Sequence, residues 1–593
     1  MSGRSIASAV TRVRLMSALD VTRVYHVLGQ RYADRELLHL QEPLGYACHS
    51  GSSLTGRQIR DLGFRIANAM SAASLTANAR VVVAKANHPD YLFYLYSAIA
   101  AGSVPVSVNA KAGWAYIRRV AAQTSARYLI SDAATLPADD DEQSCADVAA
   151  LLDAGVTFLL VGAGSAVAAR RWAGHGSVRD FVAEIENAPA EPPQPRLTAP
   201  DSVIAMFHTS GTTGTPKCCI WTRRSAQRIW KIMLMTLPIT PRSRSMNAAP
   251  CSHALFFAIQ TAGLLVGAPT YVMSRFDPRE FLRTLEQCRI THVIAFPYVY
   301  MRVLAEDLDA YDLSSMRLWA TGADKAHAAH IAKLIRLGGL RLFPGGRKGS
   351  VFIDSYGSTE IGAGGILQLW TPGSRPVPCL QGKPMPTQFG VRIVDEQWQD
   401  LPRGAEGRIL VRSSTHFDGY WNDHDTWAGF RHDGWWWGGD TGRIGRRGQL
   451  FFLDREADSV VTPAGLIRTL PLEERLLEHP GVMEAAVFQR TTEPDSRLGE
   501  AVAWVVPRGA LTTADLNNIP GIPELELELR AWANELLEPP KRVSEVRAVA
   551  LESVPFGVTG KVLKRQLREQ ASIQVPVPAT ADRAAADRER KSR

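Results

Sequence analysis

A loop rich in glycine and hydroxyl side chains is the strongest chemical signal in the chain. It follows an apolar run of strand length and comprises Thr209, Ser210, Gly211, Thr212, Thr213, Gly214, Thr215, Pro216 and Lys217. Glycines permit backbone angles at which successive N–H groups converge on an anion, and the lysine adds a positive charge. The loop could therefore hold the β- and γ-phosphates of a nucleotide. It is not a Walker A loop, because Pro216 precedes the lysine and Cys218 follows it.

A second motif, Asp-Ser-Tyr-Gly-Ser-Thr-Glu at positions 354–360, follows an apolar run that predicts a strand. The ring of Tyr356 could stack on adenine, and the hydroxyl of Thr359 could donate to a phosphate. The carboxylate of Glu360 could ligate a hard cation. The alternative interpretation is a turn at a strand end with an exposed glutamate.

Together, these motifs resemble those of the adenylate-forming superfamily, which contains acyl-CoA synthetases, adenylation domains of peptide synthetases and luciferases. The resemblance extends from about Arg60 to Arg568 and rests on several motifs in the expected order. It implies that Tyr356 stacks on the base, Thr359 touches the α-phosphate and Glu360 holds Mg²⁺. It also implies an α/β fold, with a large N-terminal domain of layered α/β subdomains and a small, mobile α+β C-terminal domain.

Further positions match the superfamily pattern. Gly322 and Ala323 match a loop that lies beside the adenine and the acyl group in the superfamily. Asp440 matches an aspartate that accepts hydrogen bonds from both ribose hydroxyls. Lys561, in Pro-Phe-Gly-Val-Thr-Gly-Lys, resembles a lysine that reaches the site during adenylation. By themselves, these segments could be ordinary turns. The expected catalytic residues are Lys561, Glu360 and Thr209, and the nucleotide-binding residues also include Asp354, Gly357 and Arg455.

The acyl pocket is expected to be apolar. The resemblance places His253, Phe257, Gly357 and Gly362 in it, although the His and Phe side chains could equally belong to the core. Gly357 stands at a position where acetate-specific relatives have a tryptophan. Because glycine leaves room there, the resemblance favours an acid larger than acetate. The segment 254–257 lacks the aspartate that pairs with an α-amino group in amino-acid-specific relatives. An aliphatic or aryl acid is therefore expected.

Alternating strand-like and helix-like segments independently predict α/β layers with largely parallel sheets. The expected domains are residues 1–454 for AMP and acyl binding, 455–572 for the lid, and a disordered tail at 573–593 that lacks an apolar period. The segment 454–458 resembles the interdomain hinge, with Ala457 at the hinge position. Pro463 and Ala464 stand where the family often has paired glycines that line the pantetheine tunnel, and they make this loop stiffer. This departure concerns transfer of the acyl group to a thiol more than formation of the acyl-adenylate.

Composition narrows the class of protein. The 593 residues contain 67 Lys and Arg against 59 Asp and Glu, without a basic stripe interleaved with aromatics, so nucleic acid is not an expected partner. Seven cysteines without a C-x-x-C pair fit a reducing compartment. No stretch has the length and apolarity of a signal peptide or transmembrane helix. A cytoplasmic protein is expected.

The expected activity is therefore a two-step ligation. An acid would react with ATP, aided by Mg²⁺ and Lys561, to give acyl-AMP and pyrophosphate, and the acyl group would pass to a thiol, most simply coenzyme A. One alternative acceptor is the phosphopantetheine arm of a carrier protein. Another class remains open, a non-catalytic nucleotide-binding protein on the same fold, which the hinge departures favour and the intact motifs oppose.

Overall fold

The computed structural model describes residues 20–49, 51–194, 199–209, 216–322, 324–491, 496–535 and 537–573. The chain divides into two compact units. Unit 1 runs to Phe452 and includes Val558–Gly560, whereas unit 2 runs from Leu453 to Gly557 and resumes at Lys561. The boundary expected from the sequence lies between residues 454 and 455.

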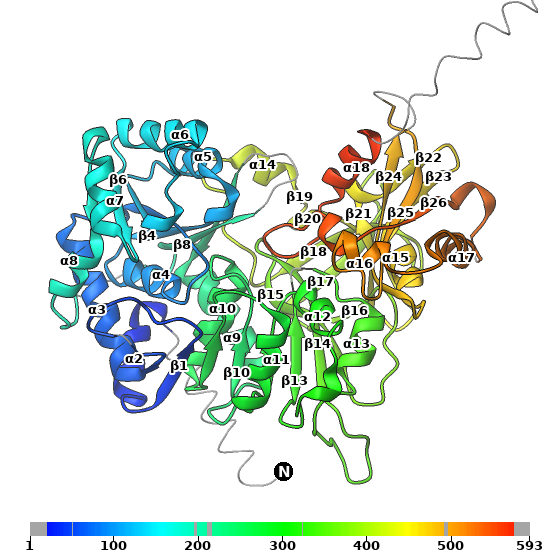
Figure 1. Cartoon of the computed structure of the whole chain (residues 1–593), viewed down its shortest axis with the longest axis horizontal. Coiled ribbons are helices and arrows are strands. Elements are labelled where there is room, and N and C mark those ends of the chain that lie inside the picture. The colour runs from blue at the N-terminus through cyan, green and yellow to red at the C-terminus, as the bar shows by residue number, and fades with distance from the viewer. Residues whose placement is uncertain are drawn as a thin grey trace, which may run out of the picture. The chain divides into compact units, whose positions relative to one another are not determined.

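One sheet of unit 1 has the strand order β7-β6-β5-β3-β4-β8-β9 among the described residues (Figure 1). Neighbouring strands are parallel, apart from the antiparallel pair β8 and β9. The strands are β3 (Arg80–Lys85), β4 (Val104–Asn109), β5 (Tyr128–Asp132), β6 (Thr157–Val161), β7 (Val178–Asp180), β8 (Val203–Thr209) and β9 (Lys217–Thr222). Their Val-, Leu- and Ile-rich sequences suit strands that are covered on both faces.

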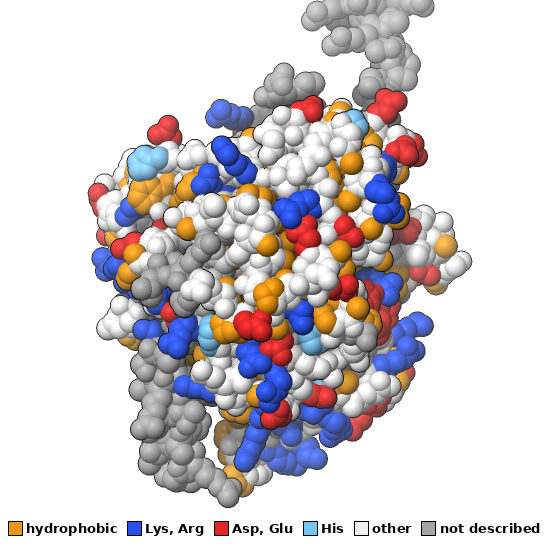
Figure 2. Space-filling model, turned by 90° about the vertical axis from the view of Figure 1, so that its left-hand side faces the viewer, with side chains coloured by type: hydrophobic (Ala, Val, Ile, Leu, Met, Phe, Trp, Pro, Cys, Tyr) orange, Lys and Arg blue, Asp and Glu red, His pale blue; other side chains and the backbone are white. Residues whose placement is uncertain are grey.

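Helices accompany this sheet: α2 (Val24–Arg31), α3 (Gly56–Ala72), α4 (Tyr91–Ala100), α5 (Trp114–Thr124), α6 (Glu142–Asp153), α7 (Ser165–Trp172) and α8 (Phe181–Asn187). A capping box between Thr55 and Gln58 begins α3. Nearly every residue of α4 is buried, as expected for a helix that is apolar all round. On the face that Figure 2 turns to the viewer, basic and acidic side chains are interspersed, as on an ordinary solvated surface.

A second sheet has the order β17-β18-β20-β21-β16-β15-β14-β13-β12-β10-β11-β1-β2, with β19 beside β20. Its parallel part runs from β1 through β11, β10, β12 and β13 to β14. The strands are β1 (Glu36–Leu40), β2 (Ser53–Thr55), β10 (Ser245–Asn247), β11 (Thr270–Val272), β12 (His292–Ile294), β13 (Leu318–Thr321), β14 (Val351–Ser358), β15 (Gly362–Trp370), β16 (Leu380–Pro384), β17 (Phe389–Val394), β18 (Gly407–Ser413), β19 (Arg431–His432), β20 (Trp435–Ile444) and β21 (Leu450–Arg455).

Helices pack on both faces of the parallel part. They are α9 (Arg223–Thr236), α10 (Ala254–Leu265), α11 (Pro278–Gln287), α12 (Pro297–Val303) and α13 (Ala328–Leu334), and α14 (His424–Gly429) lies farther along the chain. Side chains alternate between the faces of a strand. Ala320 and Ile353 accordingly join the cluster of α9 and α10, whereas Trp319 and Phe352 join that of α11 and α12.

Two chemical motifs lie in strands rather than in the turns that their sequences suggested. Residues 354–358 continue β14, because they pair antiparallel with β15, where Tyr356 lies opposite Ile366. Asp440 likewise lies inside β20, and the flanking Thr441 pairs with Arg408 of β18. Pairing with neighbouring strands of the sheet therefore overrides the turn preference of the local Gly and Ser residues.

Unit 2 contains a short hairpin and a small sheet with the order β24-β25-β26. Its elements are β22 (Val460–Thr462), β23 (Gly465–Ile467), α15 (Thr469–Leu477), β24 (Val482–Thr491), β25 (Gly499–Pro507), α16 (Thr513–Asn517), α17 (Ile522–Asn534), β26 (Val543–Ala548) and α18 (Lys564–Ile573). Buried Asp454 accepts hydrogen bonds from the Thr469 N–H at 2.7 Å and the Thr469 hydroxyl at 2.9 Å. The carbonyl of Ala457 accepts from Arg568 at 3.3 Å, so the predicted hinge segment is bonded to unit 2.

Among the described residues, no helix combines the length and apolarity needed to cross a bilayer. All seven cysteines belong to the described residues, and each is a thiol without a disulfide partner.

Candidate active site

Strands β8 and β9 hold the ends of the predicted phosphate loop side by side. Thr209, the last residue of β8, pairs with Lys217, the first of β9. The Lys217 ammonium lies 4.7 Å from the ring centre of Phe430 and 5.7 Å from that of Tyr420. It forms no ion pair with a carboxylate in the described part of the chain, so its charge is available to an anion. The intervening Ser210, Gly211, Thr212, Thr213 and Gly214 lie outside the described residues.

Glu360 is oriented by Tyr420, a residue that the sequence reasoning missed. The Tyr420 hydroxyl donates to Glu360 Oε1 at 2.9 Å. Burial, reinforced by the adjacent carboxylate, raises the pKa of Tyr420 far above its usual value, so the hydroxyl stays a donor. The Glu360 carbonyl accepts from the Phe417 N–H at 2.9 Å. These contacts fix one carboxylate oxygen of a partly exposed glutamate.

The segment around Tyr420 also extends the edge of β9. Cys219 forms an antiparallel bridge with Tyr420, and the Trp421 N–H donates to the Cys218 carbonyl at 2.9 Å. This pairing across about two hundred residues brings Tyr420 beside both Lys217 and Glu360. Nothing in the local sequence marks Tyr420, because its role depends on that long-range pairing.

Tyr356 and Asp440, the residues expected to bind the base and the ribose, contact each other directly. The Tyr356 hydroxyl donates to Asp440 Oδ2 at 2.6 Å. One residue comes from β14 and the other from β20, which are separated by β15, β16 and β21 in the sheet order. A carboxylate has capacity for further donors, so Asp440 can still accept from ribose hydroxyls.

Asp354, predicted to bind the nucleotide, lies elsewhere. Its carboxylate is fully buried and paired with the ammonium of Lys325. Lys325 also donates to the Leu380 carbonyl at 3.1 Å. Because the carboxylate is buried and already paired with a cation, it is not accessible to a nucleotide. We therefore interpret Asp354 as a structural residue of β14.

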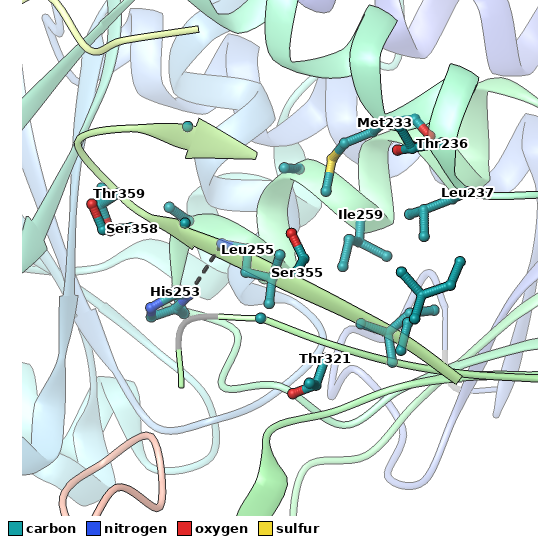
Figure 3. A pocket seen from close by; sticks show the side chains of 18 of the residues that line it. Met233, Thr236, Leu237, His253, Leu255, Ile259, Thr321, Ser355, Ser358 and Thr359 are labelled. Carbon is teal, nitrogen blue, oxygen red and sulfur yellow. Dashed lines mark hydrogen bonds between the residues drawn. The ribbon is translucent and has the colours of Figure 1, made fainter. Parts of the chain in front are cut away.

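An apolar cavity is lined in part by the 354–360 motif, through Ser355, Gly357, Ser358 and Thr359 (Figure 3). One end is lined by Ser358 and Thr359, and the other by Met233 and Leu237 at the end of α9 (Figure 3). The remaining lining residues are Trp221, Thr236, His253, Ala254, Leu255, Ala258, Ile259, Ile294, Ala320, Thr321, Gly322, Ile353, Gly362 and Leu367. None of the described lining residues is Asp, Glu, Lys or Arg, which suits an uncharged acyl group.

His253 is the only lining side chain, among the described residues, whose ordinary pKa lies near neutral pH. Its Nδ1 accepts from the Leu255 N–H at 3.1 Å and so begins α10 (Figure 3). Burial lowers the pKa of His253 to about 4, helped by nearby His208. At neutral pH the cavity therefore contains no charged imidazole.

Gly357 and Gly362 both line the cavity, but backbone packing requires them to be glycine. A Cβ on Gly357 would lie 2.9 Å from the Gly362 carbonyl oxygen. Gly362 has φ +80°, and a Cβ there would lie 2.5 Å from the Thr415 carbonyl oxygen. Glycine at 357 is therefore no measure of the acid's size, and the expectation of an acid larger than acetate rests on the extent of the cavity.

Phe257 was predicted in the pocket, and the structure corrects this. It is fully buried and contacts the rings of Trp221, Trp230 and Phe207 rather than the cavity. On α10, Leu255, Ala258 and Ile259 line the cavity instead. The residues i+3 and i+4 from Leu255 share its helix face, whereas Phe257 points away.

The described residues contain no cluster of three or more His, Cys, Asp and Glu that could hold a metal alone. Glu360 supplies one partly exposed carboxylate. This donor set fits Mg²⁺, which is usually bound through one or two carboxylates together with phosphate oxygens and water.

The other predicted residues divide between the units. Gly322 lines the cavity, and Ala323 lies outside the described residues. Arg455 and Lys561 belong to unit 2. The Lys561 carbonyl accepts from the Gly557 N–H at 2.8 Å, and Phe556 bridges Val562, so the lysine lies on a tight turn.

Comparison with known proteins gives one consistent result. The sequence matches the family described as AMP-binding enzyme over residues 29–421, and its C-terminal domain over 471–561. It is 31% identical to the medium/long-chain-fatty-acid–CoA ligase FadD8 of Mycobacterium tuberculosis, over 63% of each chain. It is 27% identical to the feruloyl-CoA synthase of an Amycolatopsis species, over 88% of this chain and 95% of that one.

A solved structure confirms the predicted fold class. The anthranilate CoA ligase AuaEII, in complex with anthranoyl-AMP, superposes with a TM-score of 0.76 at 19% identity. The superposition covers 94% of this chain and 99% of that one.

Proposed function

We propose that this chain, which belongs to the AMP-binding enzyme family, joins a carboxylic acid to AMP with release of pyrophosphate and transfers the acyl group to coenzyme A. One observation carries the proposal. The segment 356–362 supplies the tyrosine bonded to Asp440, the carboxylate of Glu360, and several residues that line an uncharged cavity. Nucleotide-binding groups and an acyl pocket therefore share one stretch of chain.

The chemistry explains the charges in the site. A carboxylate that attacks an α-phosphate meets like-charge repulsion, and its transition state places more charge on the phosphoryl oxygens. Lys217 is proposed to bind the phosphates, and Lys561 to neutralise charge as the acyl-phosphate bond forms. A Mg²⁺ held by Glu360 would supply further neutralisation when bound. Asp440 is proposed to accept from the ribose, with Tyr356 beside the base.

The cavity defines the class of acid. Since the described lining residues include no charged side chain, an acid with a second carboxylate or an α-ammonium group would lose solvation without compensation. An aliphatic or aryl acid larger than acetate fits best. The names of the relatives, a fatty-acid ligase and a feruloyl-CoA synthase, agree with this range.

The remaining assignments extend this proposal. Residues 455–572 are proposed to form the mobile lid. Of the expected tail at 573–593, Ile573 ends α18, and residues 574–593 lie outside the described residues. Coenzyme A is preferred over a carrier-protein arm because both of these relatives are CoA ligases. A cytoplasmic location stays a prediction, which is supported by the absence of a disulfide among the seven cysteines, all of them described.

Acid-dependent exchange of labelled pyrophosphate into ATP tests the first step. We expect exchange with medium-chain or aryl acids, little with acetate, and a loss of about a hundredfold or more in Lys561→Ala. Absence of exchange with every acid would favour a non-catalytic binding protein. Exchange followed by transfer only to a holo carrier protein, and not to coenzyme A, would overturn the proposed acceptor.

A further inference from the structure

A short hairpin connects α13 to β14 and is defined here as residues 340–349. Its base is closed by an antiparallel bridge, in which the Leu340 N–H donates to the Gly349 carbonyl at 2.8 Å and the reverse bond measures 3.1 Å. At the tip, the Gly346 N–H donates to the Phe343 carbonyl at 3.0 Å. The hairpin therefore has a defined backbone shape.

The tip of the hairpin carries apolar side chains that point to solvent. Leu342 is 46% exposed and Phe343 is 66% exposed, and Pro344 beside them is exposed as well. Large apolar side chains on adjacent positions of a projecting turn are costly in water unless something covers them.

All the Asp, Glu, Lys and Arg side chains in the segment around this tip are basic ones. No Asp or Glu occurs between Asp324 and Asp354. The same stretch contains the basic residues Lys325, Lys333, Arg336, Arg341, Arg347 and Lys348. Arg341, Arg347 and Lys348 belong to the hairpin and are largely accessible, and none of the three pairs with a carboxylate in the described part of the chain.

The hairpin lies away from the candidate active site. β14 runs parallel to β13, and the hairpin ends just before its first residue, Val351 (Figure 1). The cavity-lining residues Thr321 and Gly357 lie at the opposite, carboxyl ends of the same two strands. The exposed tip thus needs an explanation other than catalysis.

We propose that this hairpin docks the protein on an anionic lipid surface, with Leu342 and Phe343 entering the interfacial region and Arg341, Arg347 and Lys348 meeting the headgroups. Charge complementarity supports this occupant, because each basic side chain near an anionic leaflet strengthens binding. A stable protein–protein interface needs roughly 1,000 Å² or more of matched surface, whereas the apolar part of this tip consists of Leu342, Phe343 and Pro344. A bilayer requires no matched surface. This docking role is independent of the proposed function.

Co-sedimentation of the full chain with vesicles tests the proposal. The two compositions are phosphatidylcholine alone and phosphatidylcholine mixed with phosphatidylglycerol. We expect binding to the mixed vesicles only, weakened by salt. The double variant Leu342→Ser/Phe343→Ser should bind about tenfold more weakly or worse. Arg347→Gln/Lys348→Gln should lose about thirtyfold, as expected for two basic residues.

Val167→Ser/Arg170→Gln on α7 is the matched control, since Val167 is 64% exposed and Arg170 is an exposed basic residue. This variant should bind like the wild type, and unchanged melting temperatures should show that all variants fold. Undiminished binding by both hairpin variants would overturn the proposal. So would the absence of vesicle binding, including the case in which the hairpin instead retains a protein partner.

Discussion

Single residues set the chemistry of the candidate site, and Glu360 is the most directly testable. Its Oε1 is held at 2.9 Å by the Tyr420 hydroxyl. Glu360→Gln keeps the side-chain shape and an acceptor for Tyr420 but removes the charge that would bind Mg²⁺. We expect acid-dependent pyrophosphate exchange to fall about a hundredfold or more, and the Mg²⁺ concentration for half-maximal rate to rise.

Tyr420→Phe is the companion variant, because it removes only the hydrogen bond that orients the carboxylate. A loss of about tenfold is expected, in keeping with one hydrogen bond to a charged group. Exchange by Glu360→Gln at the wild-type rate and Mg²⁺ dependence would contradict the role given to this glutamate.

For single residues, the sequence indicates which side chains could bind the nucleotide, but it does not indicate which side chains contact them. The Tyr356–Asp440 contact agrees with a shared nucleotide site, although the roles of both residues remain proposals. Tyr420 went unnoticed because its place depends on pairing with Cys219. Phe257 was misplaced because the helical register that turns it into the core is fixed only by tertiary packing.

Among the elements, the start of β15 depends on Gly362. Its φ of +80° and the nearby Thr415 backbone leave no room for a side chain. Gly362→Ala should lower the free energy of unfolding by about 2 kcal/mol or more, through backbone strain plus a steric clash. Gly404→Ala is the control, since Gly404 also has positive φ but a Cβ there would meet no atom within 4 Å. It should cost about 1 kcal/mol. Equal losses in urea unfolding would contradict the packing argument.

Helix α10 offers a test of the acyl cavity. Ala258 lines it, between Leu255 and Ile259. Ala258→Phe should fill part of the cavity and lower kcat/KM for long or aryl acids by about a hundredfold, with little change for a short acid such as propionate. Parallel losses for short and bulky acids, or none for either, would show that this cavity does not receive the acyl group.

Elements were predictable where the signal was local. The apolar runs that become β3, β4 and β8, and the apolar helix α4, are evident in the sequence. The extension of β14 through Ser358 and the placement of Asp440 in β20 were not, because both depend on strand pairing, of β14 with the next strand β15 and of β20 with the earlier strand β18. The same limit applies to the exposed tip of the 340–349 hairpin, which becomes evident only from burial.

For the whole molecule, buried neutral histidines predict a pH dependence of stability. Burial lowers the pKa of His292 to about 4 from its ordinary value of 6.5, and that of His253 to about 4. The unfolded chain therefore binds protons that the folded chain does not. Their stabilising contribution is complete above about pH 6.5 and declines as the pH falls toward 4, by up to about 1.4 kcal/mol per pH unit for each histidine.

His292→Asn should reduce that slope by up to one histidine's share, measured by urea unfolding at a series of pH values. His292 suits the test because it is buried outside the cavity. An unchanged slope would mean that His292 is protonated equally in the folded and unfolded states.

The central claim is that the acid's own oxygen becomes bonded to the α-phosphorus of ATP. An acid labelled with oxygen-18 in its carboxylate, incubated with the enzyme, ATP, Mg²⁺ and coenzyme A, tests it directly by mass spectrometry of the nucleotide products. The account predicts AMP that carries one labelled oxygen, formed together with pyrophosphate and the acyl thioester. Unlabelled AMP, or label in inorganic phosphate alongside ADP, would contradict it.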